Sequence, residues 1–243
     1  MSRSIPSQVL FVTASGTGLG KTLITAALCH QLRAQGLAVA ALKPVMSGFS
    51  SSERAASDAG ILAMGLGRPV TERSIDEISR FRFRAALAPN MAARRQGKRL
   101  RFPSLVGFCR RAMTNPSDLT LIEGVGGVMS PVTDSKTVLD WIVALQAPAL
   151  LVTGNYLGGI SHTLTAVAAM RAARVKLIGV IVSEANNSVV PVTETLNFLR
   201  GALKPLKVAH LPRIGGAHPW KRAPDLIGIL RQSPEFRWLA KVR

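Results

Sequence analysis

Cysteine is scarce in this sequence. Cys29 and Cys109 are the only two cysteines among 243 residues, and nothing near them resembles a metal site. Secreted domains that depend on disulfides are rich in cysteine, so this composition favours reduced thiols in a cytosolic protein.

Long uninterrupted hydrophobic runs are also missing. The N-terminal sequence MSRSIPSQVLFVT has one arginine and no clean apolar core, which argues against a signal peptide. One hydrophobic stretch, 141–160, is interrupted by Gln146, Pro148, Gly154 and Asn155, a set that a membrane helix would not contain. We therefore expect a soluble, cytoplasmic protein without a membrane partner.

Acidic residues are few, since 13 Asp and Glu stand against 31 Lys and Arg, a formal net charge of +18. A field of this sign attracts polyanions, including nucleic acid and ATP. Aromatic residues make up only 5% of the chain, so stacking platforms for single strands are not evident. We expect a solvated basic surface rather than nucleic-acid binding. The basic residues cluster at 94–101, at 110–111 and along 221–243.

The sequence does contain a regular alternation of short apolar and longer amphipathic segments. The apolar segments predict buried strands over 9–13, 39–42, 119–122, 149–152 and 177–182. The intervening segments predict helices over 21–35, 57–64, 92–96, 105–113, 137–145, 160–173 and 193–203. This rhythm predicts an α/β fold with a single doubly wound, mostly parallel sheet and helices on both faces. We expect one domain over 1–243, in which 48–102 is less regular and 215–243 is a basic extension without a clear role.

A glycine-rich motif, SGTGLGKT over 15–22, lies between the first predicted strand and the first predicted helix. Glycines let backbone N–H groups approach a phosphate closely, and the start of a helix adds a positive dipole. Lys21 can reach the β- and γ-phosphates of ATP, and the Thr22 hydroxyl can bind Mg²⁺. The motif therefore predicts a P-loop, although Ser15 stands where the usual pattern has glycine. The predicted nucleotide-binding residues are Gly16, Thr17, Gly18, Leu19, Gly20, Lys21 and Thr22.

Three further charged residues are candidates for the same site. Glu123 ends the strand 119–122 and could bind Mg²⁺ at the carboxyl edge of the sheet. Lys43 follows the strand 39–42 and could neutralise charge on a transferring phosphoryl group, but it could also be an exposed surface lysine. Asp58 is a third candidate for the metal, and its alternative is a helix N-cap or first-turn acid.

These motifs occur in an order that resembles the dethiobiotin synthetase family of P-loop proteins. The matching stretches span 11–184 and read FVTASGTGLGKT, KPVMSG, SDA, APNMAARRQGKRLRF, LIEGVGGVMSP, LLVTGNYLGGISHTLTA and GVIVSE. The resemblance implies an ATP-dependent ligase of biotin biosynthesis that acts on 7,8-diaminononanoate. One amine would take up CO₂, the carbamate would accept the γ-phosphoryl group, and the second amine would close the ureido ring. Positioning and charge neutralisation would carry most of the catalysis.

The resemblance also implies roles for individual residues. The implied catalytic groups, which stabilise the phosphoryl group and the carbamate, are Lys21, Lys43 and Thr17. The implied ligands of Mg²⁺ are Thr22, Asp58 and Glu123. The implied contacts of the diamine are Lys43 and Ser47, together with Gly158, Gly159, Ile160 and Ser161 of the neighbouring subunit in a homodimer. The nucleotide site would also include Ser183 and Pro212.

The chain departs from the family pattern in several places. Gly-Thr-Asp is common in the family where this chain has 14–16 (Ala-Ser-Gly), and Pro-His is common where it has Pro89-Asn90. The family usually has Asn where Ser161 stands, so backbone N–H groups would carry more of the carboxylate binding. It usually has Asn-Asp where the chain has Ser183-Glu184. Because that Asn reads adenine in the family, Ser183 bears on nucleotide selectivity.

Two alternatives remain beside this resemblance. An amidating synthase of the same class would need a glutaminase domain with a nucleophilic cysteine, for which 243 residues leave no room. A DNA- or membrane-binding switch of the MinD or ParA type would use the basic surface. Such switches carry an extra lysine early in the P-loop, where this chain has Gly16.

Overall fold

The computed structural model describes residues 8–186 and 188–242. Its centre is a six-stranded sheet in which neighbouring strands are parallel, in the order β2-β5-β1-β6-β7-β8. The strands are β1 (Gln8–Ala14), β2 (Val39–Leu42), β5 (Leu119–Glu123), β6 (Ala149–Gly154), β7 (Leu177–Ser183) and β8 (Val208–Leu211). The chain places β2 and β5 on one side of β1 and the later strands on the other. The carboxyl end of β1 is therefore the switch point at which such sheets bind ligands.

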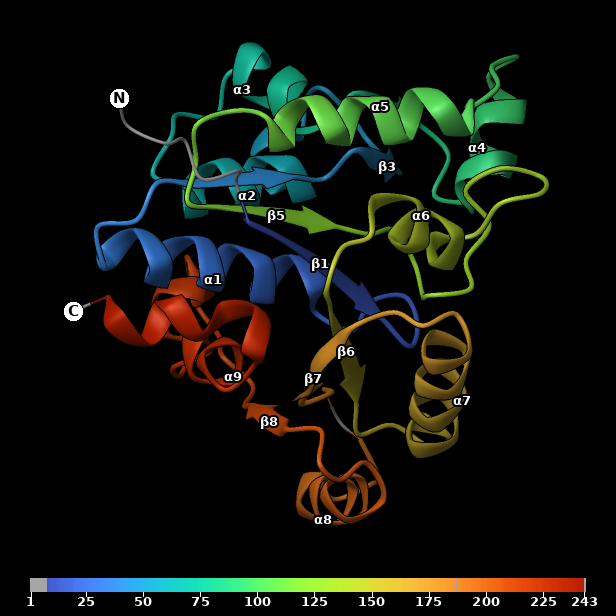
Figure 1. The fold of residues 1–243 in the computed structure, drawn as a ribbon. Coiled ribbons are helices and arrows are strands. Elements are labelled where there is room, and N and C mark those ends of the chain that lie inside the picture. The colour runs from blue at the N-terminus through green and yellow to red at the C-terminus, as the bar shows by residue number, and fades with distance from the viewer. Residues whose placement is uncertain (1–7, 187, 243) are drawn as a thin grey trace.

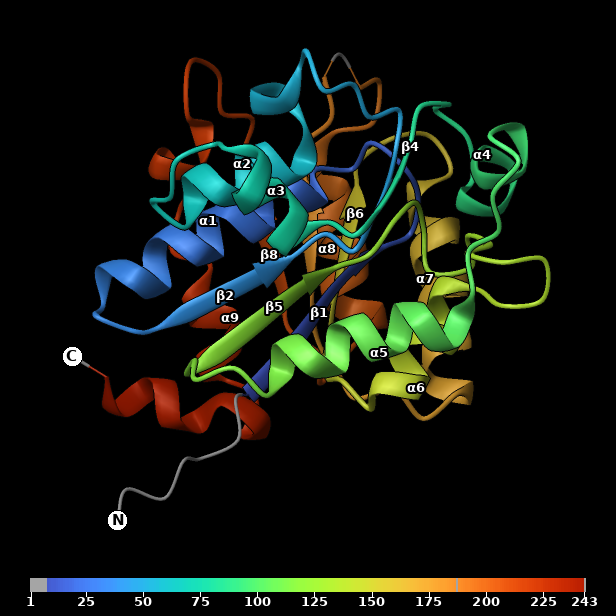
Figure 2. The ribbon, with the colours of Figure 1, turned by 90° about the horizontal axis from the view of Figure 1, so that it is seen from above.

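Helices cover both faces of this sheet, as Figure 1 and Figure 2 show. Along β1 the side chains alternate, so Leu10 and Val12 join the core under α1 while Phe11 joins the core of the opposite face. The first layer contains α1 (Lys21–Ala34), α2 (Asp58–Gly65), α3 (Glu72–Ile78), η2 (Pro219–Arg222), α9 (Ile227–Arg231) and η3 (Pro234–Lys241). The second contains α4 (Pro89–Arg95), α5 (Phe102–Met113), α6 (Val138–Leu145), α7 (Gly159–Ala172) and α8 (Val192–Ala202). The predicted α/β fold is confirmed.

The stretch 45–102, which includes the less regular region 48–102, contains elements that were not predicted from the sequence. A second sheet pairs β3 (Val45–Ser47) with β4 (Phe81–Phe83) in parallel, and a short η1 (Arg54–Ala56) precedes α2. Strands of three residues are too short to show a period-2 pattern, which explains why they were not predicted. These strands affect only the nearby structure. Through β3 the chain runs from Lys43 to Ser47 beside the carboxyl edge of the main sheet.

The C-terminal segment packs against the main sheet beside α1. Trp220, Leu226 and Phe236 are at most 4% exposed and belong to the core under α1. The Gln31 side chain of α1 also holds this segment, since its Nε2 donates to Pro224 O at 2.8 Å and its Oε1 accepts from Leu226 N at 3.0 Å. The sequence left 215–243 without a role, and the structure places its apolar side chains in the core. Residues 1–7 and Arg243, the ends of the predicted domain, lie outside the described residues.

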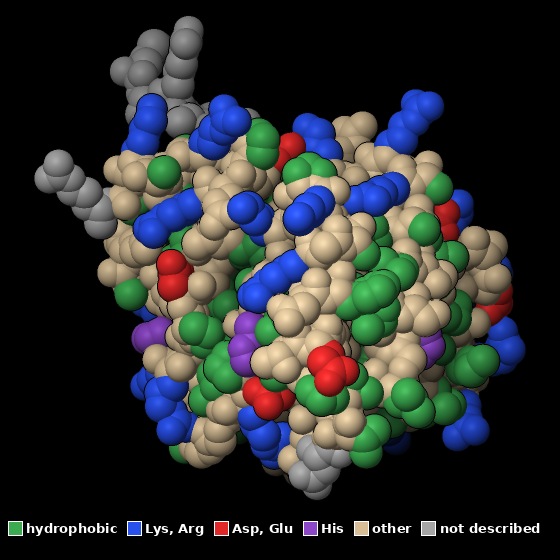
Figure 3. Space-filling view, turned by 90° about the horizontal axis from the view of Figure 1, so that it is seen from below, with side chains coloured by type: hydrophobic (Ala, Val, Ile, Leu, Met, Phe, Trp, Pro, Cys, Tyr) green, Lys and Arg blue, Asp and Glu red, His purple; other side chains and the backbone are tan. Residues whose placement is uncertain are grey.

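The surface is as basic as the composition predicts. On the face shown in Figure 3, Lys and Arg side chains clearly outnumber acidic ones and are scattered widely. Most of the interactions between opposite charges at the surface are single exposed ion pairs, such as Lys136 with Asp140 at 3.2 Å, which contribute little to stability. Within the described part of the chain, none of the helices has the length and hydrophobicity needed to span a membrane.

Candidate functional site

The P-loop joins β1 to α1 at the switch point of the sheet. Gly18 and Gly20 have φ angles of 74° and 84°, a left-handed conformation that favours glycine. Ser15, the departure from the usual motif, forms a 2.9 Å hydrogen bond through Oγ with Thr153 Oγ1 of β6. Its hydroxyl is thus tied to the sheet, and the glycine-rich turn after it can still direct backbone N–H groups at a phosphate.

Lys21 is the first residue of α1 and is only 6% exposed. Its Nζ donates to Gly126 O at 2.7 Å and lies 3.4 Å from Gly16 O. Burial, followed by the nearby charge of Lys43, lowers the pKa of Lys21 to about 8. Among the residues that the structure describes, no carboxylate forms an ion pair with Lys21, whose ammonium group contacts only carbonyl oxygens. A polyphosphate would supply an anionic partner.

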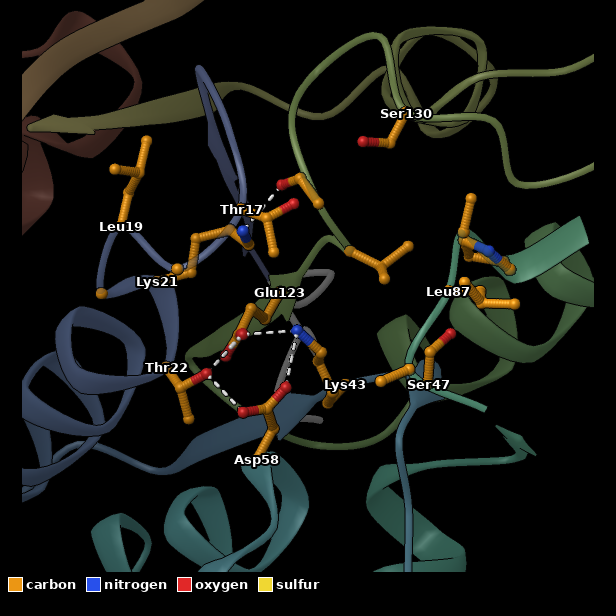
Figure 4. Close-up of a pocket in the computed structure, with 17 residues that line it drawn as sticks. Thr17, Leu19, Lys21, Thr22, Lys43, Ser47, Asp58, Leu87, Glu123 and Ser130 are labelled. Atoms are coloured by element: carbon orange, nitrogen blue, oxygen red, sulfur yellow. Dashed lines mark hydrogen bonds and ion pairs between the residues drawn. The ribbon is translucent and has the colours of Figure 1, made fainter. Parts of the chain in front are cut away.

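Lys43 joins two carboxylates that come from different elements, as Figure 4 shows. Its Nζ lies 2.6 Å from Glu123 Oε1 at the end of β5 and 3.0 Å from Asp58 Oδ2 at the start of α2. It also donates to Gly124 O at 2.8 Å. The side chain is almost fully buried, so the surface-lysine alternative is wrong.

Thr22 completes this cluster from the first turn of α1. Its Oγ1 lies 2.7 Å from Glu123 Oε1 and 2.9 Å from Asp58 Oδ1, and its single proton can be donated to one of them at a time. The side chain of Ser57 caps α2 by accepting from Gly60 N at 3.1 Å. The carboxylate of Asp58 is a first-turn acid that faces Lys43 and Thr22, and Ser57 takes the N-cap position.

Burial and charge oppose each other in this cluster. Burial works to lower the pKa of Lys43, but the negative charges of Glu123 and Asp58 outweigh it, so this pKa is raised. Burial works to raise the pKa of Asp58, and the charge of Lys43 outweighs it, so this pKa is lowered. Complete burial raises the pKa of Glu123, an effect that Lys43 opposes without cancelling. Lys43 thus stays a cation held between two acids.

Thr22, Asp58 and Glu123 are the residues that could hold a metal ion. Their donor atoms are hydroxyl and carboxylate oxygens, the ligands that Mg²⁺ prefers. Glu123 Oε2 is buried and makes no hydrogen bond to any residue that the structure describes, which is costly unless a further partner binds there. Across 8–186 and 188–242, no group of three or more His, Cys, Asp and Glu side chains forms a metal site. Phosphate oxygens and water would have to complete the shell around this smaller set.

These side chains line a pocket of about 510 Å³. Of the residues predicted from the sequence, the structure brings ten to it: Thr17, Gly18, Leu19, Gly20, Lys21, Thr22, Lys43, Ser47, Asp58 and Glu123. Ser47 Oγ is buried and has no partner among the described residues, so it is free to bind a ligand. Gly16 contributes its carbonyl to the contact with Lys21.

The pocket also has lining residues that sequence reasoning did not select as site residues. They are Ala86, Leu87, Ala88, Pro89, Val125, Gly126 and Ser130. Ser130 Oγ accepts from Gly127 N at 2.8 Å and thereby holds the turn that directs Gly126 O at Lys21. The APN and LIEGVGGVMSP stretches contain these residues, so the motifs signalled the region but not which side chains face the ligand.

The remaining predicted residues lie outside this pocket. Ser183 ends β7 close to the P-loop, because a Cβ atom on Gly20 would lie 2.9 Å from Ser183 Oγ. Pro212 follows β8 and is exposed. The segment Gly158–Ser161 forms the start of α7, next to Leu157, which is 81% exposed.

Comparisons with known proteins agree with this geometry. A family model described as an AAA domain matches residues 8–219. The chain is 48% identical over 176 residues to the ATP-dependent dethiobiotin synthetase BioD of Caulobacter sp. (strain K31), an alignment that covers 72% of this chain and 75% of that one. It is 44% identical over 207 residues to the protein of the same name from Caulobacter vibrioides (strain NA1000 / CB15N), covering 85% and 93% of the two chains.

Among solved structures, the signal recognition particle receptor FtsY from Elizabethkingia anophelis is similar with a TM-score of 0.52 and 14% sequence identity. The match covers 91% of this chain, which spans 63% of the receptor chain. At this identity the likeness concerns the fold alone. The synthetases named above match far more closely in sequence, and they favour a synthetase over a DNA- or membrane-binding switch. From the motif order, the clustered site and these relatives, we conclude that the chain belongs to the dethiobiotin synthetase family.

Proposed function

We propose that this protein forms dethiobiotin from 7,8-diaminononanoate, CO₂ and ATP as a step of biotin biosynthesis. The observation that carries the proposal is the meeting of Lys21, Thr22, Lys43, Asp58 and Glu123 in one pocket at the switch point of the sheet. Cradled phosphates, two cations and two acids are the parts that phosphoryl transfer requires.

In the reaction, one amine of the substrate adds to CO₂ and gives up a proton to form a carbamate. A carbamate oxygen attacks the γ-phosphorus, ADP leaves, and a carbamic–phosphoric anhydride results. The second amine attacks the carbonyl carbon, phosphate leaves, and the ureido ring closes. Lys21 and Lys43 stabilise the negative charge on the transferring group, and Thr17 hydrogen-bonds near the carbamate. The unpartnered hydroxyl of Ser47 supports its role in binding the diamine.

Thr22, Asp58 and Glu123 would hold Mg²⁺ in this reaction. Their oxygen donors and the unpartnered Glu123 Oε2 support this assignment. A bound Mg²⁺ would neutralise charge on the β- and γ-phosphate oxygens. Asp58, at the start of α2, and Glu123, at the end of β5, also hold Lys43 by ion pairs. These ion pairs keep a cation close to the phosphoryl group.

We also infer that the protein works as a homodimer. Gly158–Ser161, which the family resemblance assigns to the diamine carboxylate, start α7 outside the pocket that Lys43 and Ser47 line. The neighbouring Leu157 is 81% exposed, and a large exposed side chain of this kind is often covered by a partner. In a dimer, backbone N–H groups at the start of α7 could therefore serve the pocket of the other subunit.

We further propose that the enzyme acts in the cytoplasm on small molecules, without nucleic acid or membrane as a partner. The basic surface would then serve the substrates, because a positive field raises the local concentration of ATP and of a carboxylate.

The decisive experiment incubates purified protein with ATP, Mg²⁺, bicarbonate and 7,8-diaminononanoate and measures product mass and released phosphate. We expect the mass of dethiobiotin with one phosphate released per ring closed, and neither product when the diamine is omitted. ATP hydrolysis that responds to DNA and ignores the diamine would refute the proposal and favour a switch.

A further inference from the structure

The sheet order fixes the direction in which a nucleotide must lie across the P-loop. The groups proposed to meet the γ-phosphate, Lys43 and Glu123, follow β2 and β5 on one side of β1. The base is attached at the opposite end of the triphosphate from the γ-phosphate, so a nucleotide extended along the P-loop places its base on the other side, over the carboxyl ends of β7 and β8. The segments that follow these strands therefore form the base end of the site.

The end of β7 lies directly against the P-loop. A Cβ atom on Gly20 would lie 2.9 Å from Ser183 Oγ, and a Cβ atom on Gly154 would lie 3.3 Å from Ser183 O. The connection between β7 and α8 begins at this point, at the carboxyl edge of the sheet. Its first residues are thus close to whatever the P-loop binds.

Asn155 holds this connection from the end of β6. It is only 4% exposed, and both polar atoms of its side-chain amide are satisfied by main-chain groups of the connection. Oδ1 accepts from Ala185 N and Nδ2 donates to Val190 O, each at 2.7 Å. The hydroxyl of Ser188 also donates to Asn155 O.

Burying an amide carries a desolvation cost that only well-placed partners offset. An apolar side chain could fill the same space without that cost, but it would not fix the path of the connection. We propose that Asn155 is a positioning residue for the nucleotide, which holds Ala185 and Val190 of the connection so that the residues directly after Ser183 can receive the base. This inference rests on the proposed use of ATP, and it concerns affinity and base choice rather than phosphoryl transfer.

The chemistry at this end suits a neutral aromatic base. Ser183 offers a hydroxyl, and the connection offers main-chain donors and acceptors, which are the groups that recognise the edge of a purine. His210 Nε2 lies 3.5 Å from Glu184 Oε2, and the same oxygen accepts a hydrogen bond from Arg213 N at 3.3 Å. That contact ties the end of β7 to the segment after β8, so the two walls of the base site are held together.

The test compares Asn155→Leu with Gln31→Leu. Gln31 makes the same kind of amide contact, donating to Pro224 O and accepting from Leu226 N, but between α1 and the C-terminal segment. Equilibrium binding of ATP, GTP and inorganic tripolyphosphate is measured for the wild type and both variants by isothermal titration calorimetry with Mg²⁺ present. Tripolyphosphate occupies the P-loop without a base, so it reports on the phosphate end alone.

We expect Asn155→Leu to weaken ATP about tenfold, the effect of one or two lost polar contacts, and to leave tripolyphosphate unchanged. The preference for ATP over GTP should fall as well, while kcat at saturating ATP stays within twofold. Gln31→Leu should change none of these values. Equal weakening of ATP and tripolyphosphate, unchanged ATP affinity, or the same ATP-specific loss in Gln31→Leu would overturn the inference.

Ser188→Ala is the second variant, because it removes the contact of the connection with Asn155 O, together with the contacts of the Ser188 hydroxyl with Val190, and keeps the buried amide. It should weaken ATP two- to threefold in the same ligand-specific way, and it decides the matter if Asn155→Leu does not fold. These binding measurements do not depend on whether the enzyme completes a reaction. A wild type that binds ATP and not the diamine would refute the proposed reaction while leaving the role of Asn155 open to the same test.

Discussion

The two ends of the nucleotide site are built in opposite ways. Where β2 and β5 end, Lys43 lies between Asp58 and Glu123 and the cluster consists of charged side chains. Where β6 and β7 end, the buried side chain of Asn155 bonds to main-chain atoms of one connection, and no charge is involved. The first arrangement stabilises charge that changes during a reaction, whereas the second fixes a shape. We therefore expect substitutions at the first end to change the rate and those at the second end to change affinity.

The largest effect should follow from Lys21→Ala, which removes the cation of the P-loop. Turnover should fall at least a thousandfold, because the transferring phosphoryl group loses a charge partner, and Lys43 is already paired with Asp58 and Glu123. Phosphate release in the presence of the diamine is the measurement. Lys207→Ala, at the amino end of β8, serves as a control that lowers net charge equally and should retain activity. Survival of activity in Lys21→Ala would refute the P-loop assignment.

Lys43→Ala should separate rate from affinity. We expect kcat to fall roughly a hundredfold or more while the KM for ATP changes less than tenfold, because Lys43 meets the transferring group and the P-loop holds the rest of the nucleotide. Steady-state kinetics at saturating diamine measure both values. An unchanged kcat would show that the lysine only stabilises the fold.

The contribution of Lys43 to the stability of the fold has to be measured separately from its contribution to the rate. Lys43→Ala leaves the fully buried Glu123 without its cation, which should cost about 3 kcal/mol of unfolding free energy. Adding Glu123→Gln should recover much of this loss in urea denaturation, since the buried charge is gone. It should not recover kcat. Recovery of both quantities would mean that the rate loss came from instability.

A smaller effect should appear in the pH dependence of binding. The pKa of Lys21 is about 8 in the ligand-free protein, and a bound triphosphate favours the charged form. Above pH 8 binding must therefore take up a proton, and the affinity for Mg²⁺–ATP should fall about tenfold between pH 7 and pH 9. Calorimetry in two buffers of different ionisation enthalpy should show uptake of about three quarters of a proton at pH 8.5 and about a tenth at pH 7. Lys21→Arg, which stays charged, should show no uptake.

The smallest effect is expected at the base end, from Ser183→Asn. An amide at this position offers both a donor and an acceptor to a purine, so ATP binding should tighten about threefold relative to GTP with kcat unchanged. Competition binding of the two nucleotides is the measurement. If both forms of the protein bind several nucleotides equally well, position 183 does not read the base.

The sequence was informative where a structural feature depends only on residues that are neighbours along the chain. The glycines of the P-loop, the run that ends in Glu123 and the alternation along β1 each depend only on neighbouring residues. The α/β fold and most of the residues that line the pocket could therefore be predicted. The short strands β3, β4 and β8 were not predicted, because three or four residues show no period and their pairing partners lie far along the chain. The helices α3 and α9 were also missed, because five to seven residues make at most two helical turns, too few for a clear helical period. The burial of Trp220 and Phe236 was also hidden, since the basic residues around them suggest an exposed tail.

Local sequence therefore determined that this chain has a P-loop, a parallel sheet and an acid, Glu123, at the end of a strand. Only the tertiary structure decided that Lys43 is buried between Asp58 and Glu123, that Ser57 rather than Asp58 caps α2, and that Asn155 holds the connection after β7. The reason is that burial and ion pairing depend on which segments the sheet order brings together. For Lys43 and Glu123 that separation is 80 residues along the chain, a distance across which no local pattern extends.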